Sequence, residues 1–255
     1  MTFSPEWVNK KRGIRYGRGG SVLIKILSDG RPAAGPREQL VFDLDDTLLD
    51  TRYRKRAILQ HFAASMLGTG EIPRSDLQIL AGLDHGAIRF RISHTLEESG
   101  ISDPVVIKKA ARFWVQRNFT SSWLREDQPF PGAVAYVRRA HATGMNIVYL
   151  TGRSEPEMGE GTLASLRRHG FPMGDHTRLM MKPSADLADL GFKQSAIEAI
   201  NRLGPVRAAF ENEPVNLNMM ARSWPEATIF FMESLHSPDA PDVDARAVRI
   251  RSFET

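Results

Sequence analysis

Three closely spaced carboxylates are the first residues in this sequence that could do chemistry. They are Asp43, Asp45 and Asp46, and they follow a short apolar run in the stretch LVFDLDDTLLDT. Like charges this close raise one another's pKa unless a cation or a reaction needs them. Three interpretations compete: a solvated turn, a calcium loop, and a catalytic centre with a metal.

The spacing excludes the calcium loop. An EF-hand loop that began at Asp43 would need a Gly at its sixth position and a Glu at its twelfth. Those positions hold Leu48 and Arg54. A solvated turn is the ordinary explanation of an isolated D-x-D, so the rest of the chain must decide.

Further polar residues follow three other apolar runs. In chain order they are Thr151, Gly152 and Arg153 after NIVYL, Lys193 shortly after LMMK, and Glu211, Asn212, Glu213 and Asn216 after VRAAF. Ligands of an open parallel sheet bind beyond the carboxyl ends of its strands, so one such sheet would gather all these groups. Each group alone has an ordinary explanation, such as a helix cap or a surface lysine. Together they favour the catalytic centre.

The elements that would position these residues alternate from residue 130 onward. Apolar runs predict strands at 145–150, 177–182, 205–210 and 227–232, and helical patterns cover 131–144, 156–170, 192–204 and 215–224. Strands that are apolar on both faces and alternate with helices indicate a parallel sheet covered on both sides. We therefore predict a three-layer, Rossmann-like α/β fold.

A helical insert interrupts this pattern after the first strand. Residues 54–127 show helical periodicity at 56–67, 87–100 and 104–119 and no convincing strand. A link of this size is far longer than an ordinary connection. We predict an all-helical cap at 54–127 on an α/β core formed by 39–53 and 128–255.

The N-terminal segment differs from the rest in charge. The first 40 residues sum to +5 and the remaining 215 to about −1. We interpret residues 1–38 as a basic arm or, at SVLIKILSDGRP, a small hairpin. Such an arm can bind nucleic acid, but a solvated tail is the favoured interpretation.

Composition excludes several classes of protein. The chain of 255 residues has no Cys, which excludes disulfides, thiolate metal sites and cysteine nucleophiles. No signal peptide or membrane span is expected, so we predict no membrane partner and a cytoplasmic location.

With these residues in hand, the sequence resembles the haloacid dehalogenase superfamily of hydrolases over residues 39–251. DLDDT matches the D-x-D-x-T signature, IVYLTGR is similar to the second motif, and Lys193 and FENEP stand where the third and fourth motifs belong. Many members carry a helical cap directly after the first motif. Residues 1–38 match nothing in this pattern.

The resemblance implies a role for each motif. Asp43 would be the nucleophile that forms an aspartyl-phosphate, and Asp45 would protonate the leaving oxygen and then activate water. Thr151, with Gly152 and Arg153, would bind the substrate, although Arg153 could equally form a structural salt bridge. Lys193 would offset negative charge; Lys182 is the alternative third-motif lysine.

A metal ion, Mg²⁺, is the implied cofactor. Its ligands would be Asp43, the backbone carbonyl of Asp45 and an acid of the fourth motif. Here the sequence has Glu211 where Asp is commoner, and Asn212 or Glu213 could serve instead.

The favoured function is a Mg²⁺-dependent phosphatase that acts on a small phosphorylated substrate under a mobile cap. The second Asp of the motif favours phosphate esters over dehalogenation, because a halide leaving group needs no proton. One alternative is a phosphatase that acts on nucleic-acid ends or nucleotides through the basic arm. Another is a non-catalytic binding or regulatory protein, since a fold does not imply chemistry. The sequence indicates neither the substrate nor the oligomeric state.

Overall fold

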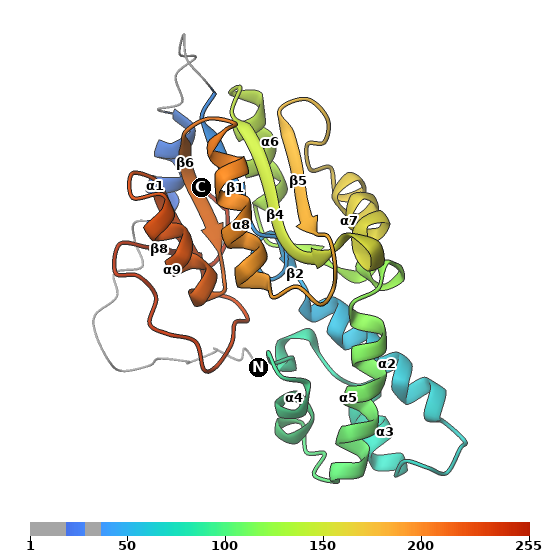
Figure 1. The fold of residues 1–255 in the computed structure, drawn as a ribbon. Helices are drawn as coiled ribbons and strands as arrows, with labels where there is room; N and C mark the ends of the chain where they lie inside the picture. Colours follow the sequence, from blue (N-terminus) through green and yellow to red (C-terminus); the bar gives the residue numbers. More distant parts are fainter. Residues whose placement is uncertain (1–18, 29–36) are drawn as a thin grey trace.

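A computed structural model describes residues 19–28 and 37–255, and its centre is a parallel sheet (Figure 1). The sheet has six strands in the order β5-β4-β1-β6-β7-β8, and each neighbouring pair is parallel. The strands are β1 (Gln39–Phe42), β4 (Asn146–Ser154), β5 (Thr177–Lys182), β6 (Val206–Glu211), β7 (Thr228–Met232) and β8 (Val248–Ile250).

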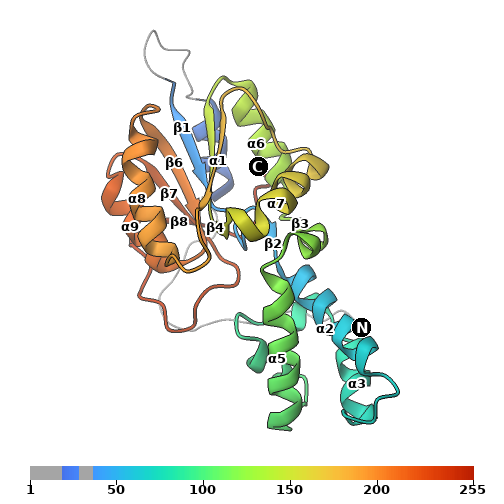
Figure 2. The ribbon, with the colours of Figure 1, turned by 45° about the vertical axis from the view of Figure 1, so that its right-hand side comes forward.

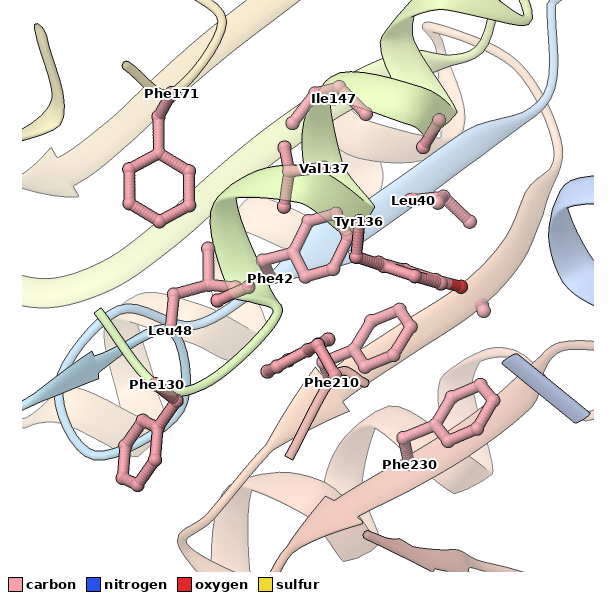
Figure 3. Packing of buried hydrophobic residues seen from close by; sticks show 14 of the residues in the cluster. Leu40, Phe42, Leu48, Phe130, Tyr136, Val137, Ile147, Phe171, Phe210 and Phe230 are labelled. Carbon is pink, nitrogen blue, oxygen red and sulfur yellow. The ribbon is translucent and has the colours of Figure 1, made fainter. Parts of the chain in front are cut away.

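Side chains of each strand alternate between the two faces of this sheet. On one face Phe210 stacks between Phe42 and Phe230, with both pairs of ring centroids 4.5 Å apart (Figure 3). Val41 and Ala209, which are the intervening residues, belong to a separate buried cluster on the other face. Both faces are therefore apolar, as the continuous apolar runs predicted.

Helices cover both faces. The first cluster includes residues of α1 (Gly19–Ser28), α6 (Ala133–Ala142) and α7 (Glu155–His169), and the second includes residues of α8 (Asp189–Asn201) and α9 (Pro214–Ser223). The predicted three-layer α/β fold is confirmed.

The helical insert lies beyond the carboxyl ends of the strands (Figures 1 and 2). It consists of α2 (Arg52–Met66), α3 (Arg74–Ala81), η1 (His85–Ala87), α4 (Ile92–Glu98), α5 (Pro104–Asn118) and η2 (Ser121–Glu126). These helices bury an apolar cluster of their own that includes Leu59, Phe62 and Leu96. A two-stranded antiparallel ribbon of β2 (Leu49–Asp50) and β3 (Gln128–Pro129) joins its two ends to the core.

The N-terminal hairpin prediction is wrong where the structure describes it. Residues 19–28 form helix α1 instead of a strand, because Leu23, Ile26 and Leu27 share one buried helical face. Arg207 donates a hydrogen bond from Nε to the Ile26 carbonyl oxygen at 3.0 Å, which holds α1 to the core. The rest of the predicted arm, residues 1–18 and 29–36, lies outside the described residues.

None of the helices in the described ranges is both long enough and apolar enough to span a lipid bilayer.

Candidate active site

Two buried carboxylates share one buried ammonium at the carboxyl edge of the sheet. Lys193 Nζ donates hydrogen bonds to Asp43 Oδ1 at 2.7 Å and to Glu211 Oε2 at 2.8 Å. All three side chains are almost completely buried, with 5% exposure or less. The structure thus brings together the predicted nucleophile, the predicted third-motif lysine and the first of the fourth-motif candidates.

The strand topology explains why these three side chains lie together. Asp43 follows the last residue of β1, and Glu211 is the last residue of β6, the strand beside β1. The backbone N–H of Asp43 donates to the carbonyl oxygen of Phe210 at 3.0 Å, which fixes the two strand ends side by side. Lys193 lies one turn inside α8, and the apolar face of α8 packs against this sheet.

Asp189 is a third acid at this cluster, and the sequence analysis missed it. It is the first residue of α8, and its Oδ2 lies 3.6 Å from Lys193 Nζ, one helical turn away. The same oxygen accepts a hydrogen bond from Asn216 Nδ2 at 2.7 Å. Its signal in the sequence was the spacing of four residues between Asp189 and Lys193.

The cluster holds more negative than positive charge. Burial and the neighbouring Glu211 raise the pKa of Asp43 well above its ordinary value, against the opposing effect of Lys193. Burial also raises the pKa of Glu211. Burial alone would lower the pKa of Lys193, but the attraction of Asp43 and Glu211 outweighs it and the pKa is raised. The lysine is therefore charged, and the carboxylates would be easier to ionise with a further cation nearby.

Asp43 and Glu211 provide part of the ligand set that a hard divalent cation needs. Asp43 and Glu211 offer carboxylate oxygens, which Mg²⁺ prefers, and Mg²⁺ usually keeps several waters or substrate oxygens as its other ligands. Among the described residues, no group of three or more His, Cys, Asp or Glu side chains is arranged to hold a metal. A Mg²⁺ ion here would rely on these two carboxylates, a backbone carbonyl and oxygens from outside the protein.

The other two fourth-motif residues have structural hydrogen bonds. Asn212 accepts from Thr47 Oγ1 at 3.0 Å and donates from Nδ2 to the carbonyl oxygen of Leu235 at 2.6 Å. Glu213 accepts from the backbone N–H of Ser237 at 3.0 Å. These contacts hold the loops around the site and leave Glu211 as the fourth-motif side chain at Lys193.

Asp45 points to a second charged cluster. Arg153 donates two hydrogen bonds to the Asp45 carboxylate, from Nη2 to Oδ1 at 2.6 Å and from Nε to Oδ2 at 3.0 Å. Arg54, from the first turn of insert helix α2, donates to Asp45 Oδ1 at 2.9 Å. Asp127 completes the cluster, 2.7 Å from Arg153 Nη2 and 3.2 Å from Arg54 Nε. Arg153 thus has the salt-bridge role that the sequence analysis left open.

This second cluster holds two carboxyl groups and two guanidinium groups. Although burial would raise the pKa of Asp45, Arg153 and Arg54 outweigh burial and hold the pKa below its usual range. Burial raises the pKa of Asp127 to about 6, against the same two arginines. In this arrangement Asp45 is ionised, so it must part from Arg153 before it can carry a proton. Arg54 and Asp127 were not predicted, because they are brought in by the two ends of the insert.

The loop after β4 places the remaining second-motif residues. Thr151 is fully buried, and its Oγ accepts the N–H of Arg153 at 3.3 Å, which leaves the hydroxyl proton as the group it can donate. Gly152 lies against α8: a Cβ there would lie 2.1 Å from Asp189 Oδ1. Glycine at 152 is therefore what allows the Asp189 carboxylate to approach.

The alternative lysine and the third Asp lie apart from Asp43 and Glu211. Lys182, the last residue of β5, is half-buried and donates from Nζ to the carbonyl oxygen of Leu187 at 2.9 Å, in the loop that follows. Asp46 occupies the left-handed region at φ 58° and accepts hydrogen bonds from Thr51, so it stabilises the turn between β1 and β2.

A cavity of about 530 Å³ opens beside Asp45, between the core and the insert. Its walls come from the turn after β1, from the start of α2, from α5 and from the segment that leads into α4. A volume of this size suits a small molecule.

The sequence and the structure differ in how far they resemble known proteins. No family model matches the sequence, and no curated protein does so significantly. Solved structures do resemble it. One is a HAD-superfamily hydrolase of subfamily IA from Geobacter sulfurreducens PCA, 14% identical over 88% of this chain and 96% of that chain, with a TM-score of 0.48.

Two others are similar in the same degree. CbbY from Rhodobacter sphaeroides, solved in complex with phosphate, is 14% identical over 86% of this chain and 95% of that chain, with a TM-score of 0.48. A predicted phosphatase from Clostridium acetobutylicum is 13% identical over 84% and 94%, with a TM-score of 0.47. At these levels of identity the likeness concerns the fold alone.

Proposed function

We propose that this protein is a Mg²⁺-dependent phosphatase that hydrolyses a phosphomonoester through an aspartyl-phosphate at Asp43. The observation that carries the proposal is the pair of buried carboxylates, Asp43 and Glu211, that shares the ammonium of Lys193 at the carboxyl edge of the sheet. Phosphoryl transfer needs positioning and charge neutralisation more than covalent machinery. A buried nucleophile beside a fixed cation supplies both.

The first half of the reaction transfers the phosphoryl group. A carboxylate oxygen of Asp43 attacks phosphorus, and the bond from phosphorus to the ester oxygen breaks. Asp45, once it has parted from Arg153 and taken up a proton, donates that proton to the leaving oxygen. The Thr151 hydroxyl donates to a phosphoryl oxygen, and Lys193 balances the charge of the phosphoryl group and Asp43.

The second half restores the enzyme. Asp45, now a carboxylate, accepts a proton from a water molecule as the water attacks phosphorus, and the bond from phosphorus to Asp43 breaks. Phosphate leaves and Asp43 is free again. Bound Mg²⁺, held by Asp43, Glu211 and the Asp45 backbone carbonyl, would neutralise phosphoryl charge and keep Asp43 ionised.

Phosphate release from a panel of substrates tests the proposal. The panel holds alkyl, aryl and sugar phosphates and 3′- or 5′-phosphorylated oligonucleotides, each assayed with Mg²⁺ and with EDTA. We expect release that requires Mg²⁺ and is lost in Asp43→Asn, a near-isosteric change that removes the nucleophile's charge. A preference for oligonucleotides that falls steeply with salt would instead favour the nucleic-acid alternative.

A matched pair of lysine variants tests the third motif. Lys193→Met removes the only charge that Asp43 and Glu211 share within the described structure, so kcat/KM should fall at least about 100-fold, in the range found when a preorganised charge is removed. Lys182→Met, at the end of β5, removes an ammonium that contacts the carbonyl oxygen of Leu187, so it should change kcat/KM less than about twofold. Equal losses in both variants, or full activity in a folded Asp43→Asn, would contradict the mechanism.

A further inference from the structure

Part of the wall of the cavity beside Asp45 is apolar. Six of its lining residues are apolar, and all come from the insert: Phe90, Ile92, Ala111, Trp114, Val115 and Phe119. Three of them are large side chains left exposed, namely Phe90 at 42%, Val115 at 53% and Phe119 at 52%. Exposed apolar side chains that gather at one hollow indicate that a ligand covers them.

Each cation that lines the cavity has a carboxylate partner. Arg54 lies 2.9 Å from Asp45, and Lys55 lies 3.8 Å from Asp46. Arg91, the third, forms an ion pair with Asp239. Within the described structure no lining cation is left over for a second phosphate or a carboxylate. The part of the occupant that enters the cavity is therefore uncharged, which argues against a leaving group that carries a second phosphate, as in a sugar bisphosphate.

Apart from the ion-paired residues, the wall has few polar side chains, and two of their atoms lack partners in the described structure. Asn118 is 96% buried, and its Oδ1 has no hydrogen-bond partner in the described structure; the same holds for the buried Nε1 of Trp114. Buried polar atoms without partners are costly. Neither atom is accessible from the cavity, so the uncharged polar groups that its wall can offer to a ligand are the hydroxyls of Thr51 and Ser93. A polyol would need many more partners.

The position of the two catalytic acids says which part of a substrate enters the cavity. Asp45, which would protonate the leaving oxygen, lines the cavity, whereas Asp43 is not among the described residues that line it. The leaving group therefore extends from Asp45 into the cavity while the phosphoryl group faces Asp43. Resting on the phosphatase function proposed above, we infer that the substrate is a phosphomonoester whose leaving group is uncharged and mainly apolar.

Two pairs of esters test this class with leaving-group acidity held nearly constant. The first pair is 2-naphthyl phosphate and phenyl phosphate; the second is n-hexyl phosphate and glucose 6-phosphate, both esters of primary alcohols. We expect kcat/KM to be higher for the more apolar member of each pair. Burying the second naphthyl ring should give about tenfold.

Two valines of helix α5 provide matched variants. Val115 and Val105 are 53% and 57% exposed, and only Val115 lines the cavity. Val115→Asn should lower the naphthyl-to-phenyl ratio at least about threefold, the value of roughly one buried methylene, while Val105→Asn leaves it unchanged. Phe119→Asn, at another half-exposed lining residue, should act like Val115→Asn.

Binding is measured separately from hydrolysis with inert phosphonates. We expect 2-naphthylmethylphosphonate to bind more tightly than methylphosphonate in titration calorimetry, and Val115→Asn to remove most of the difference. Equal hydrolysis of both members of each pair, with no binding preference, would overturn the substrate class and leave the phosphatase standing. Preferential binding without hydrolysis of any ester would support the cavity's ligand class and overturn the phosphatase.

Discussion

At the residue scale, the close approach of Gly152 and Asp189 connects the second motif to the lysine cluster. Asp189 contacts both Lys193 and Asn216, so its carboxylate helps to hold α8 and α9 at the site. The Asp189 carboxylate occupies the space that a side chain at position 152 would need. The glycine therefore acts on the position of Lys193 through Asp189.

Gly152→Ala tests this connection. The added methyl group would lie 2.1 Å from Asp189 Oδ1, so the carboxylate must move away. We expect kcat/KM to fall at least about tenfold, the equivalent of roughly 1.4 kcal/mol. Gly191→Ala in α8 is the control, because its added methyl group meets nothing within 4 Å. That control should retain activity and gain about 0.5–1 kcal/mol of stability. A Gly152→Ala enzyme with full activity would show that Asp189 does not support the site.

At the element scale, the cluster of Asp45, Arg54, Asp127 and Arg153 joins three parts of the chain. Arg153 comes from β4, Arg54 from α2, and Asp127 from the residue before β3. The network therefore ties the start and the end of the insert to the sheet at the predicted general acid. Any movement of the insert that displaces Arg54 would change the charge environment of Asp45.

Asp127→Asn tests the electrostatics of this network. The pKa of Asp127 is raised from 3.8 to about 6, so the folded protein holds this proton more tightly than the unfolded chain. The resulting stability is present below about pH 4 and is lost as the pH rises to about 6. Asn has no proton to lose, so the free energy of unfolding of the variant relative to wild type should rise by about 2 kcal/mol from pH 4 to pH 7.

Urea denaturation at several pH values between 4 and 7 measures this difference. Asp186→Asn, at an exposed loop position, is the control and should follow wild type at each pH. A difference between Asp127→Asn and wild type that does not change with pH would mean that Asp127 titrates normally.

The elements of the core were predictable because their apolar runs have both faces buried. The edge elements were not. The strand β8 is only three residues long and two of them are half-exposed, so it has no apolar run. The helix α1 was mistaken for a strand because SVLIKIL is rich in β-branched residues, and its packing against the core decided otherwise.

Only part of the candidate site was predictable from the sequence. Asp43, Lys193 and Glu211 meet because a general rule of parallel sheets gathers strand ends. The contact of Arg54 with Asp45 depends on how the insert folds back, which no local pattern encodes. The cavity required the same long-range information: Trp114 packs against the apolar cluster of the insert and also lines the cavity.

At the scale of the whole molecule, the segment 233–239 connects the insert with the site. Leu235 packs against the apolar cluster of the insert, and its carbonyl oxygen accepts from Asn212. Ser234 donates to the carbonyl oxygen of Asp46, and Asp239 pairs with Arg91 of the insert. The insert is thus held by a third contact besides the two chain connections of the ribbon.

Leu235→Ala should loosen the insert without unfolding the core. Loss of part of a half-buried apolar side chain costs about 1 kcal/mol, so amide hydrogen exchange in α4 should accelerate roughly fivefold while β1 and β6 stay protected. Leu187→Ala, which truncates a leucine that is 39% exposed in another loop, is the control and should change neither. Unchanged exchange in α4 would mean that the Leu235 side chain does not help to hold the insert.

The ribbon of β2 and β3 has a consequence for how this chain could be altered. Leu49 pairs with Pro129 and Asp50 with Gln128, so the insert leaves and rejoins the core at neighbouring points. Joining residue 50 to residue 128 through a short turn would turn the ribbon into an ordinary β-hairpin. A different set of helices could then be grafted at the same two positions to give a new cavity wall, provided that the graft keeps Arg54 and Asp127 as the partners of Asp45 and Arg153.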